Sequence, residues 1–132
     1  MFEISGRIPL ATAIKVRNPY LTIAGQTAPA PGIMLSGAGL IILTHDALVQ
    51  HLQVRVGDSP GGPNPTSRDG ISVQGATAAY NVVFDHVSVS WALDENASTG
   101  YPNTNDVTFS NSIIAEGLYR SIHPDGPHSK GL

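Results

Sequence analysis

Acidic residues gather around one strand-like part of this 132-residue chain. Asp69 comes directly before Gly-Ile-Ser-Val, and Asp94 and Glu95 follow the segment Val82–Trp91. Carboxylate oxygens are hard ligands that suit a cation such as Ca²⁺, whose remaining places can be filled by water or by a ligand's own oxygens. Asp69, Asp94 and Glu95 are therefore candidate metal ligands. The alternative is that Asp69 is a turn residue before Gly70 and that Asp94 and Glu95 lie in a solvated loop.

The same region carries the clearest internal repeat. Three segments superpose without gaps and share apolar positions: Ala47–Arg55, Val82–Ser90 and Val107–Ala115. One polar position lies between the apolar ones, and it is occupied by His51, His86 and Asn111. A repeat near 25 residues is what a coiled parallel β-helix needs, because stacked rungs together bury an apolar face that no rung buries alone. The three polar residues would then stack as a ladder at one corner.

Short segments of alternating polarity precede the first repeat, at Phe2–Gly6, Ala13–Arg17 and Tyr20–Gln26. Their period of two predicts strands, and no part of the chain carries a helical stripe. We therefore expect one all-β domain over residues 1–132, a short parallel β-helix of three-strand rungs with a Pro/Gly-rich loop insertion at 58–68. A β-sandwich is the alternative fold, although Asp69-Gly70 is the only hairpin signal of its kind.

The composition limits the classes of function. With 14 Gly, 10 Pro and only 13% charged residues, the chain suits short strands and tight turns. A net charge of −3 argues against a general nucleic-acid binder but is compatible with an acidic sugar polymer, because local cations can reverse the field at one cleft. The absence of Cys excludes disulfides and thiolate metal sites. No apolar run approaches the roughly 18 residues of a membrane span.

Several motifs together resemble the pectate lyase superfamily of polysaccharide lyases, in its family-1-like bacterial form. The most specific is Val83-Phe-Asp-His-Val-Ser-Val-Ser-Trp91, and Leu93-Asp-Glu follows it. The other matching pieces are Phe2–Gly6, Leu21–Pro29, Asp69–Ile71, Ser110–Ile114 and Gly126–Leu132. They occur in the family's order and cover nearly the whole chain.

This resemblance implies a right-handed parallel β-helix that cleaves polygalacturonate, an acidic polysaccharide, by β-elimination, usually with Ca²⁺. Carried onto this sequence, it implies that Asp69, Asp94 and Glu95 hold the calcium and that Lys130 binds a substrate carboxylate. Ser98 stands near a position where the family has a further acidic residue. The resemblance also implies a secreted protein, although the start of this chain is not a secretory signal.

The catalytic base is the part that this sequence leaves open. The family's catalytic arginine lies C-terminal to the lysine segment, and the family's N-terminal capping helix has no counterpart here. We therefore expect the chain to correspond to the N-terminal and middle rungs. Lys130, Arg120 and His128 are then the candidate catalytic residues, and His123 is a further one. A histidine is the easiest of these to use as a base near neutral pH.

Candidates for substrate binding are Lys130, Arg120, Arg68 and Trp91. Trp91 could stack on a sugar ring, or it could be an anchor in the core or in a loop. The five His residues include no helical His-x-x-x-His pair, which argues against a zinc site.

Three functions fit these observations: a lyase acting on an acidic polysaccharide, a non-catalytic module that binds uronate polymers, and an inactive structural fragment of a lyase. A lyase assay on polygalacturonate separates the first from the other two. Uncapped ends of a β-helix expose unpaired strand edges and apolar rung ends, so we also expect a homo-oligomer. Neither a nucleic acid nor a membrane is an expected partner.

Overall fold

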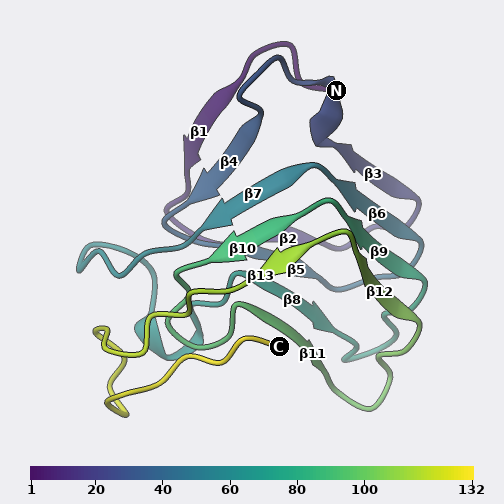
Figure 1. Cartoon of the computed structure of the whole chain (residues 1–132). Helices are drawn as coiled ribbons and strands as arrows, with labels where there is room; N and C mark the ends of the chain where they lie inside the picture. The colour runs from purple at the N-terminus through teal and green to yellow at the C-terminus, as the bar shows by residue number, and fades with distance from the viewer.

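The computed structural model describes all residues from Met1 to Leu132. Its strands form three parallel sheets that wind into a β-helix (Figure 1). Each strand pairs with strands of the turns before and after it and not with its neighbours in sequence. The prediction of an all-β parallel β-helix is confirmed. The parallel pairing excludes a β-sandwich, whose sheets are antiparallel.

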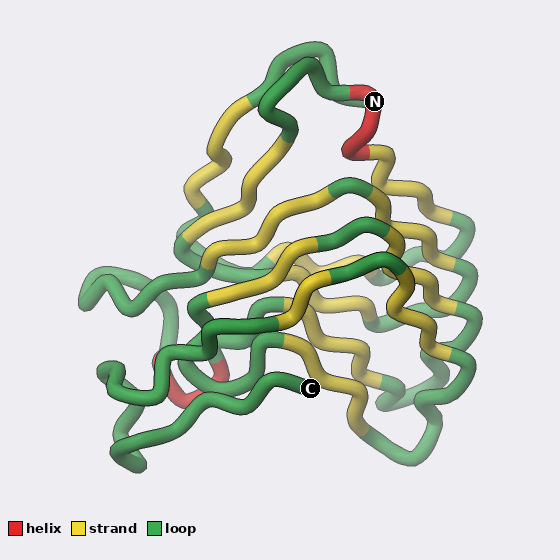
Figure 2. Tube along the Cα trace, in the orientation of Figure 1, coloured by secondary structure: helices red, strands yellow, loops and turns green.

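The sheets are named here by their place in each turn. Sheet A consists of β1 (Gly6–Pro9), β4 (Ile33–Ser36), β7 (Leu52–Arg55), β10 (Ser88–Ser90) and β13 (Ile113–Ile114). Sheet B consists of β2 (Ile14–Val16), β5 (Leu40–Ile42), β8 (Ile71–Gln74) and β11 (Ala97–Gly100). Sheet C consists of β3 (Leu21–Ala24), β6 (Ala47–Gln50), β9 (Val82–Asp85) and β12 (Val107–Ser110). Two short 3₁₀ helices, η1 (Gly25–Thr27) and η2 (Pro65–Ser67), lie in connections (Figure 2). Neither is long and apolar enough to span a bilayer.

The core runs the length of the stack because alternate side chains of every strand point inward. In sheet C, Val49 pairs in register with Phe84, and Phe84 pairs with Phe109. The two phenylalanine rings stack with their centroids 4.7 Å apart. A single cluster of 18 buried apolar residues fills the interior. Stability therefore comes from stacking between rungs, as in other solenoids.

The corner from sheet C to sheet A is the tightest and repeats in successive rungs. His51, His86 and Asn111 occupy it with φ angles of 50°, 54° and 50°. Asn and His are among the non-glycine residues that adopt this left-handed conformation most readily. The His51 and His86 rings stack with centroids 4.7 Å apart. The polar ladder expected from the repeat is thus present.

The first strand begins later than the sequence pattern predicts. The segment Phe2–Gly6 was expected to be a strand, but β1 begins only at Gly6. The Phe2 N–H donates to Thr27 Oγ1 at 2.7 Å, and Ser5 Oγ donates to the Ala30 carbonyl at 3.2 Å. Residues before Gly6 therefore bond to the η1 region instead of to a ladder.

Long connections lead from sheet A to sheet B. They span residues 56–70 after β7, residues 91–96 after β10, and residues 115–129 after β13. In Figure 1 the first and the last of these extend from the same side of the stack. This side borders sheet B, so the connections can supply side chains to its outer surface.

Candidate functional site

Asp69 and Glu95 lie just before β8 and β11 of sheet B, and Lys130 lies beside Glu95 in the next turn. The Gly70 N–H donates to the Glu95 carbonyl at 2.9 Å, and Glu95 and Lys130 form an isolated parallel bridge. The Lys130 N–H donates to the Asp94 carbonyl at 2.8 Å. The backbone ladder therefore brings together the candidate metal ligands and the candidate carboxylate-binding lysine, which are far apart in the sequence.

Gly70 and Asn96 fix this edge of the sheet. Asn96 is fully buried, with Oδ1 accepting from the Ala92 N–H at 3.0 Å and Nδ2 donating to the Ala115 carbonyl at 2.9 Å. A Cβ on Gly70 would lie 2.4 Å from Val89 Cγ1 and 2.5 Å from the Asn96 carbonyl oxygen. Only glycine fits there without displacing the next rung. The acids on either side are thus held by a rigid, close-packed backbone.

Oxygen atoms of Asp69, Asp94 and Glu95 all lie within 4.8 Å of one another. Burial, and then repulsion from Glu95 and Asp94, raises the pKa of Asp69 to about 6. The Glu95 N–H opposes this shift only in part, because it approaches Asp69 Oδ1 no closer than 3.5 Å. Crowded, partly buried carboxylates of this kind are stabilised by a cation.

Lys130 supplies one cation to the cluster. Its Nζ donates to Glu95 Oε1 at 3.1 Å, and this hydrogen bond and the charge of Glu95 raise the pKa of Lys130. One ammonium facing three carboxylates leaves an excess of negative charge. The donor set of hard carboxylate oxygens therefore fits a divalent cation such as Ca²⁺.

The three acids line a groove of about 500 Å³ on sheet B, together with Lys130. Ser72 and Ser98 continue the groove along the strands, and Ser98 Oγ donates to Ser72 Oγ at 3.0 Å. Neutral hydroxyls thus occupy the place where the family resemblance implies a further acid. A cation held by the acids would complete its shell with other oxygens.

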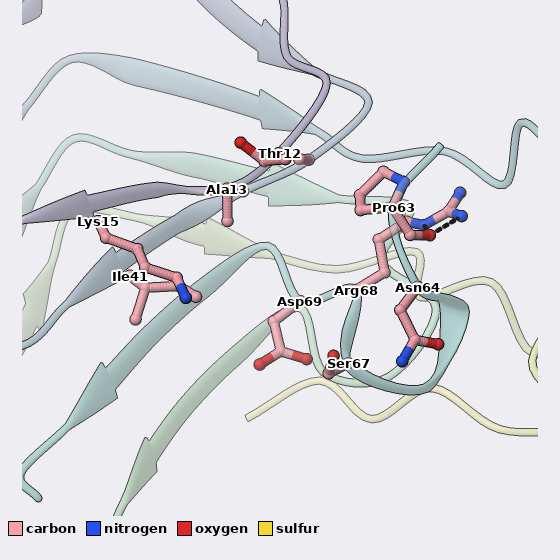
Figure 3. Close-up of a pocket in the computed structure, with 11 residues that line it drawn as sticks. Thr12, Ala13, Lys15, Ile41, Pro63, Asn64, Ser67, Arg68 and Asp69 are labelled. Atoms are coloured by element: carbon pink, nitrogen blue, oxygen red, sulfur yellow. Dashed lines mark hydrogen bonds between the residues drawn. The ribbon is translucent and has the colours of Figure 1, made fainter. Parts of the chain in front are cut away.

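A second groove, of about 510 Å³, borders Asp69 on its other side (Figure 3). Figure 3 shows the Asp69 carboxylate and the Arg68 guanidinium pointing in opposite directions. Arg68 is buried and donates to the Ser59 carbonyl at 3.0 Å and to the Pro63 carbonyl. The structure therefore uses Arg68, a candidate for substrate binding, to hold the 56–70 connection together.

Lys15 also lines this second groove, as a cation that the sequence reasoning did not select. It lies in β2, in register with Ile41 of β5, which is in register with Ser72 of β8. The signal that could have identified it is the alternation of β2, combined with the repeat register, which sets Lys15 in the outward row of sheet B.

His128 and His123 lie beside Asp94. His128 Nε2 is 2.9 Å from Asp94 Oδ1, and the two imidazoles stack with centroids 4.0 Å apart and an interplanar angle of 2°. Atoms of this trio also lie within 4.8 Å of one another. A metal lies in the plane of each imidazole that binds it, and parallel planes do not meet. The arrangement suits His128 as a partner of Asp94 better than it suits a zinc site.

Two other candidates lie outside the acidic grooves. Arg120 is exposed in the 115–129 connection and makes no side-chain hydrogen bond or ion pair. Trp91 follows β10, and its Nε1 donates to Glu116 Oε2 at 3.2 Å. The structure does not bring either residue to the carboxylate cluster.

Sequence comparison shows which known proteins this chain is similar to. No protein-family model matches the chain. It is 39% identical over 119 residues to a protein of Aspergillus flavus named "Probable pectate lyase C". Proteins of the same name from Neosartorya fischeri and Aspergillus terreus are 38% identical over 119 residues and 37% identical over 120 residues. Each match covers 89% of this chain and 26% of the relative, so the chain spans about a quarter of the relatives' length. Along most of its length the chain is therefore similar to a part of these proteins, and its parallel β-helix of three sheets is consistent with the pectate lyase superfamily.

Proposed function

We propose that this chain belongs to a polysaccharide lyase that cleaves an acidic uronate polymer, polygalacturonate, by Ca²⁺-assisted β-elimination. The observation that carries the proposal is the set of three carboxylates and one ammonium on successive rungs of one open groove. The name shared by the relatives supports the same class of substrate. Because a polymer of this kind cannot enter a cell, secretion is part of the proposal.

β-Elimination from a uronate breaks the bond between the β carbon and the glycosidic oxygen after a proton leaves the carbon next to the carboxylate. The reaction needs neutralisation of that carboxylate, a base for the proton, and protonation of the departing oxygen. Neutralisation matters most for the first step, because the carbon acid is otherwise very weak.

Asp69, Asp94 and Glu95 would hold Ca²⁺, which supplies positive charge for the substrate carboxylate when it is bound. Lys130 lies at the same groove, and its ammonium, now paired with Glu95, can exchange this partner for a substrate carboxylate. Its raised pKa keeps Lys130 positively charged near neutral pH, which suits binding of an anion.

The same raised pKa makes Lys130 a poor proton acceptor. Arg120 is not among the residues that line the groove. Of the four candidates, His128 is the one imidazole within hydrogen-bond distance of a carboxylate of the cluster, at 2.9 Å from Asp94 Oδ1. If His128 Nε2–H donates to Asp94, Nδ1 is left as the proton acceptor. We therefore assign the base role to His128.

A lyase assay on polygalacturonate tests the proposal through the ultraviolet absorbance of the unsaturated product. We expect product with Ca²⁺ present, none with a chelator, and none from Asp94→Ala. Asp106→Ala is the matched control, because Asp106 lies at an exposed corner outside the grooves. Product formation that is indifferent to chelator and to Asp94→Ala would refute the proposal.

The assay also separates the lyase from the non-catalytic binding module. Calcium-dependent binding of oligogalacturonate without any product would favour the module. His128→Gln should abolish product and leave calcium binding measurable, because the Gln amide lies near the position of imidazole Nε2 and can keep a hydrogen bond to Asp94. Full activity in His128→Gln would remove His128 from the mechanism while leaving the metal ligands in place.

A further inference from the structure

A third groove, of about 490 Å³, lies on the outer face of sheet A. It shares no lining residue with either of the two grooves that border Asp69. Its size falls within the range of roughly 300–1,000 Å³ that is usual for small-ligand sites. The residues that line it carry a different chemistry from the acidic cluster, because they include two arginines, one tryptophan and no acid.

Two glycines line the groove where the chain leaves successive sheet A strands. The left-handed position after the strand is Gly37 in one rung and Gly57 in the next, with φ angles of 83° and 73°. In the following rung Trp91, directly after β10, also has a left-handed φ, of 65°. The Trp91 indole is the one aromatic side chain that lines the groove.

Trp91 is held in place but remains accessible. Its backbone carbonyl accepts from the Gly57 N–H at 2.8 Å, and its Nε1 donates to Glu116 Oε2 at 3.2 Å. The residue is nevertheless 44% exposed. An exposed indole fixed at its polar edge offers its apolar face to a ligand, and the C–H face of a pyranose ring is a suitable partner.

Two guanidiniums line the same groove without a carboxylate partner. Arg55 is oriented by bonds to the Ser88 carbonyl and to Ser88 Oγ, both 2.7 Å long, and its Cζ lies 5.9 Å from the centroid of the Trp91 ring. Arg7, in β1, is exposed and makes no side-chain hydrogen bond or ion pair. A guanidinium has five N–H donors, so Arg55 keeps donors in reserve and Arg7 keeps all of its own.

We infer that this groove is a second saccharide-binding site, which takes one uronate unit of an acidic sugar chain at a distance from the carboxylate cluster. The sugar ring packs on Trp91, and its carboxylate is bound by Arg7 and Arg55, in the planar geometry that suits guanidinium and carboxylate. Charge complementarity selects an acidic sugar, because the lining contains two cations and no acid. The inference rests on the proposed function only in its choice of galacturonate as the sugar.

Trp91 is the one tryptophan of the chain and lines this groove, so its fluorescence is a probe of binding there. The test is a titration of the protein with trigalacturonate in the presence of a chelator, which silences a calcium-dependent site. We expect a saturable change in emission. A neutral 1,4-linked galactotriose should bind at least about tenfold more weakly, because it cannot form the charge-assisted hydrogen bonds.

Single-residue variants test whether the sheet A groove, and not the acidic groove, binds the sugar. Arg7→Gln should weaken trigalacturonate binding about tenfold, because it removes one charged partner from an exposed position without breaking an internal bond. Arg17→Gln is the matched control, since Arg17 is also exposed and lines none of the three grooves. Trp91→Ala, followed by calorimetry because the fluorophore is lost, should abolish the chelator-resistant binding.

Equal affinity for the neutral sugar, or an affinity that is unchanged in Arg7→Gln, would overturn the inference. So would a fluorescence change that disappears in Asp94→Asn, because the signal would then originate in the acidic groove. Lyase activity is the separate readout: if Trp91→Ala retains activity and loses chelator-resistant binding, the second site stands. If wild-type protein shows no chelator-resistant binding but cleaves polygalacturonate, the inference fails and the proposed function does not.

Discussion

Asp85 and Asp69 show how differently two sides of the β-helix treat a carboxylate. Asp85 ends β9 beside the His ladder, and hydrogen bonds from Asn111, His86 and Ser110 hold its pKa well below the ordinary value. Asp69 has one long donor and two like charges nearby, and its burial raises its pKa to about 6. The corner satisfies its carboxylate with the protein's own groups, whereas the groove leaves its carboxylates to be satisfied by something else.

This contrast separates scaffold from site on physical grounds. Where every charge has a partner within the chain, a residue contributes to the fold and has little left to offer a ligand. Where like charges are held together by a rigid backbone, part of the folding free energy is spent on keeping them close, which is typical of functional positions. Variants on the two sides should therefore differ in which property they lose.

Truncating the scaffold should have the largest effect. Phe84→Ala removes a fully buried ring that stacks on Phe109, and it should lower the free energy of unfolding by about 3–5 kcal/mol. Urea unfolding followed by circular dichroism measures the change. Ile113→Ala, at a residue that is 64% exposed, is the control and should stay within about 0.5 kcal/mol of the wild type. A loss of less than 1 kcal/mol in Phe84→Ala would contradict the role of the stacked core.

Removing a charge from the groove should spare the fold and cost function. Asp94→Asn keeps the shape of the side chain and should weaken Ca²⁺ binding by on the order of 100-fold or more, because even second-shell changes cost 10–100-fold. Calorimetry measures the affinity, and urea unfolding should show a change within about 1 kcal/mol. If Asp94→Asn binds Ca²⁺ as tightly as Asp106→Asn does, the acids are not the ligands.

The pH dependence of stability should differ in sign between the two carboxylates. Because the folded state raises the pKa of Asp69 from an ordinary 3.8 to about 6, the native protein binds more protons than the unfolded chain in this interval. Without Ca²⁺, the Asp69 contribution therefore lowers stability as pH rises from about 4 to 6. Asp69→Asn should remove this decline in urea unfolding measured across the interval.

Asp85 should make the free energy of unfolding change with pH in the opposite direction. Its lowered pKa gives a stabilisation that is present above the ordinary pKa of an aspartate and is lost as pH falls toward the folded-state value. Asp85→Asn should thus reduce stability at neutral pH and flatten the acid limb of the profile. Identical pH profiles for Asp69→Asn and Asp85→Asn would erase the distinction between the two sides.

The smallest effect is expected within the His ladder. His86→Asn should change the free energy of unfolding by less than about 1 kcal/mol, because Asn111 already occupies the same corner one rung away with a similar φ. His86→Val should cost more, since a β-branched residue is strained at a φ of 54°. Thermal unfolding of the two variants compares them directly, and equal losses would show that backbone strain is not what selects the residue.

The repeat could be predicted from sequence because its signal is local and periodic. Matched apolar positions set the register, and the place of His51, His86 and Asn111 follows from it. The repeat depends only on the periods of two and of one rung. The acid cluster is expected on a different basis, from the carboxylates of Asp69, Asp94 and Glu95 that flank the repeat segment and from the family resemblance.

The long connections could not be predicted in the same way. Arg68 turns inward toward its own loop, and Trp91 faces a groove on sheet A, because no period fixes side-chain direction outside a strand. Lys15 has a periodic signal, yet its significance depends on Asp69 lying across the same groove. Side-chain contacts between rungs decide these cases, and they become visible only when the turns are stacked.

The uneven length of the connections has a consequence for how this molecule can change over time. Residues 56–70 interrupt one turn, yet β7 still pairs with β10 and β8 with β11 in unbroken register. Extra residues at this corner alter the surroundings of the grooves without disturbing a single ladder. New ligand preferences can therefore arise by exchange of loops on an unaltered coil, while the corner that holds His51 and His86 stays short in its rungs.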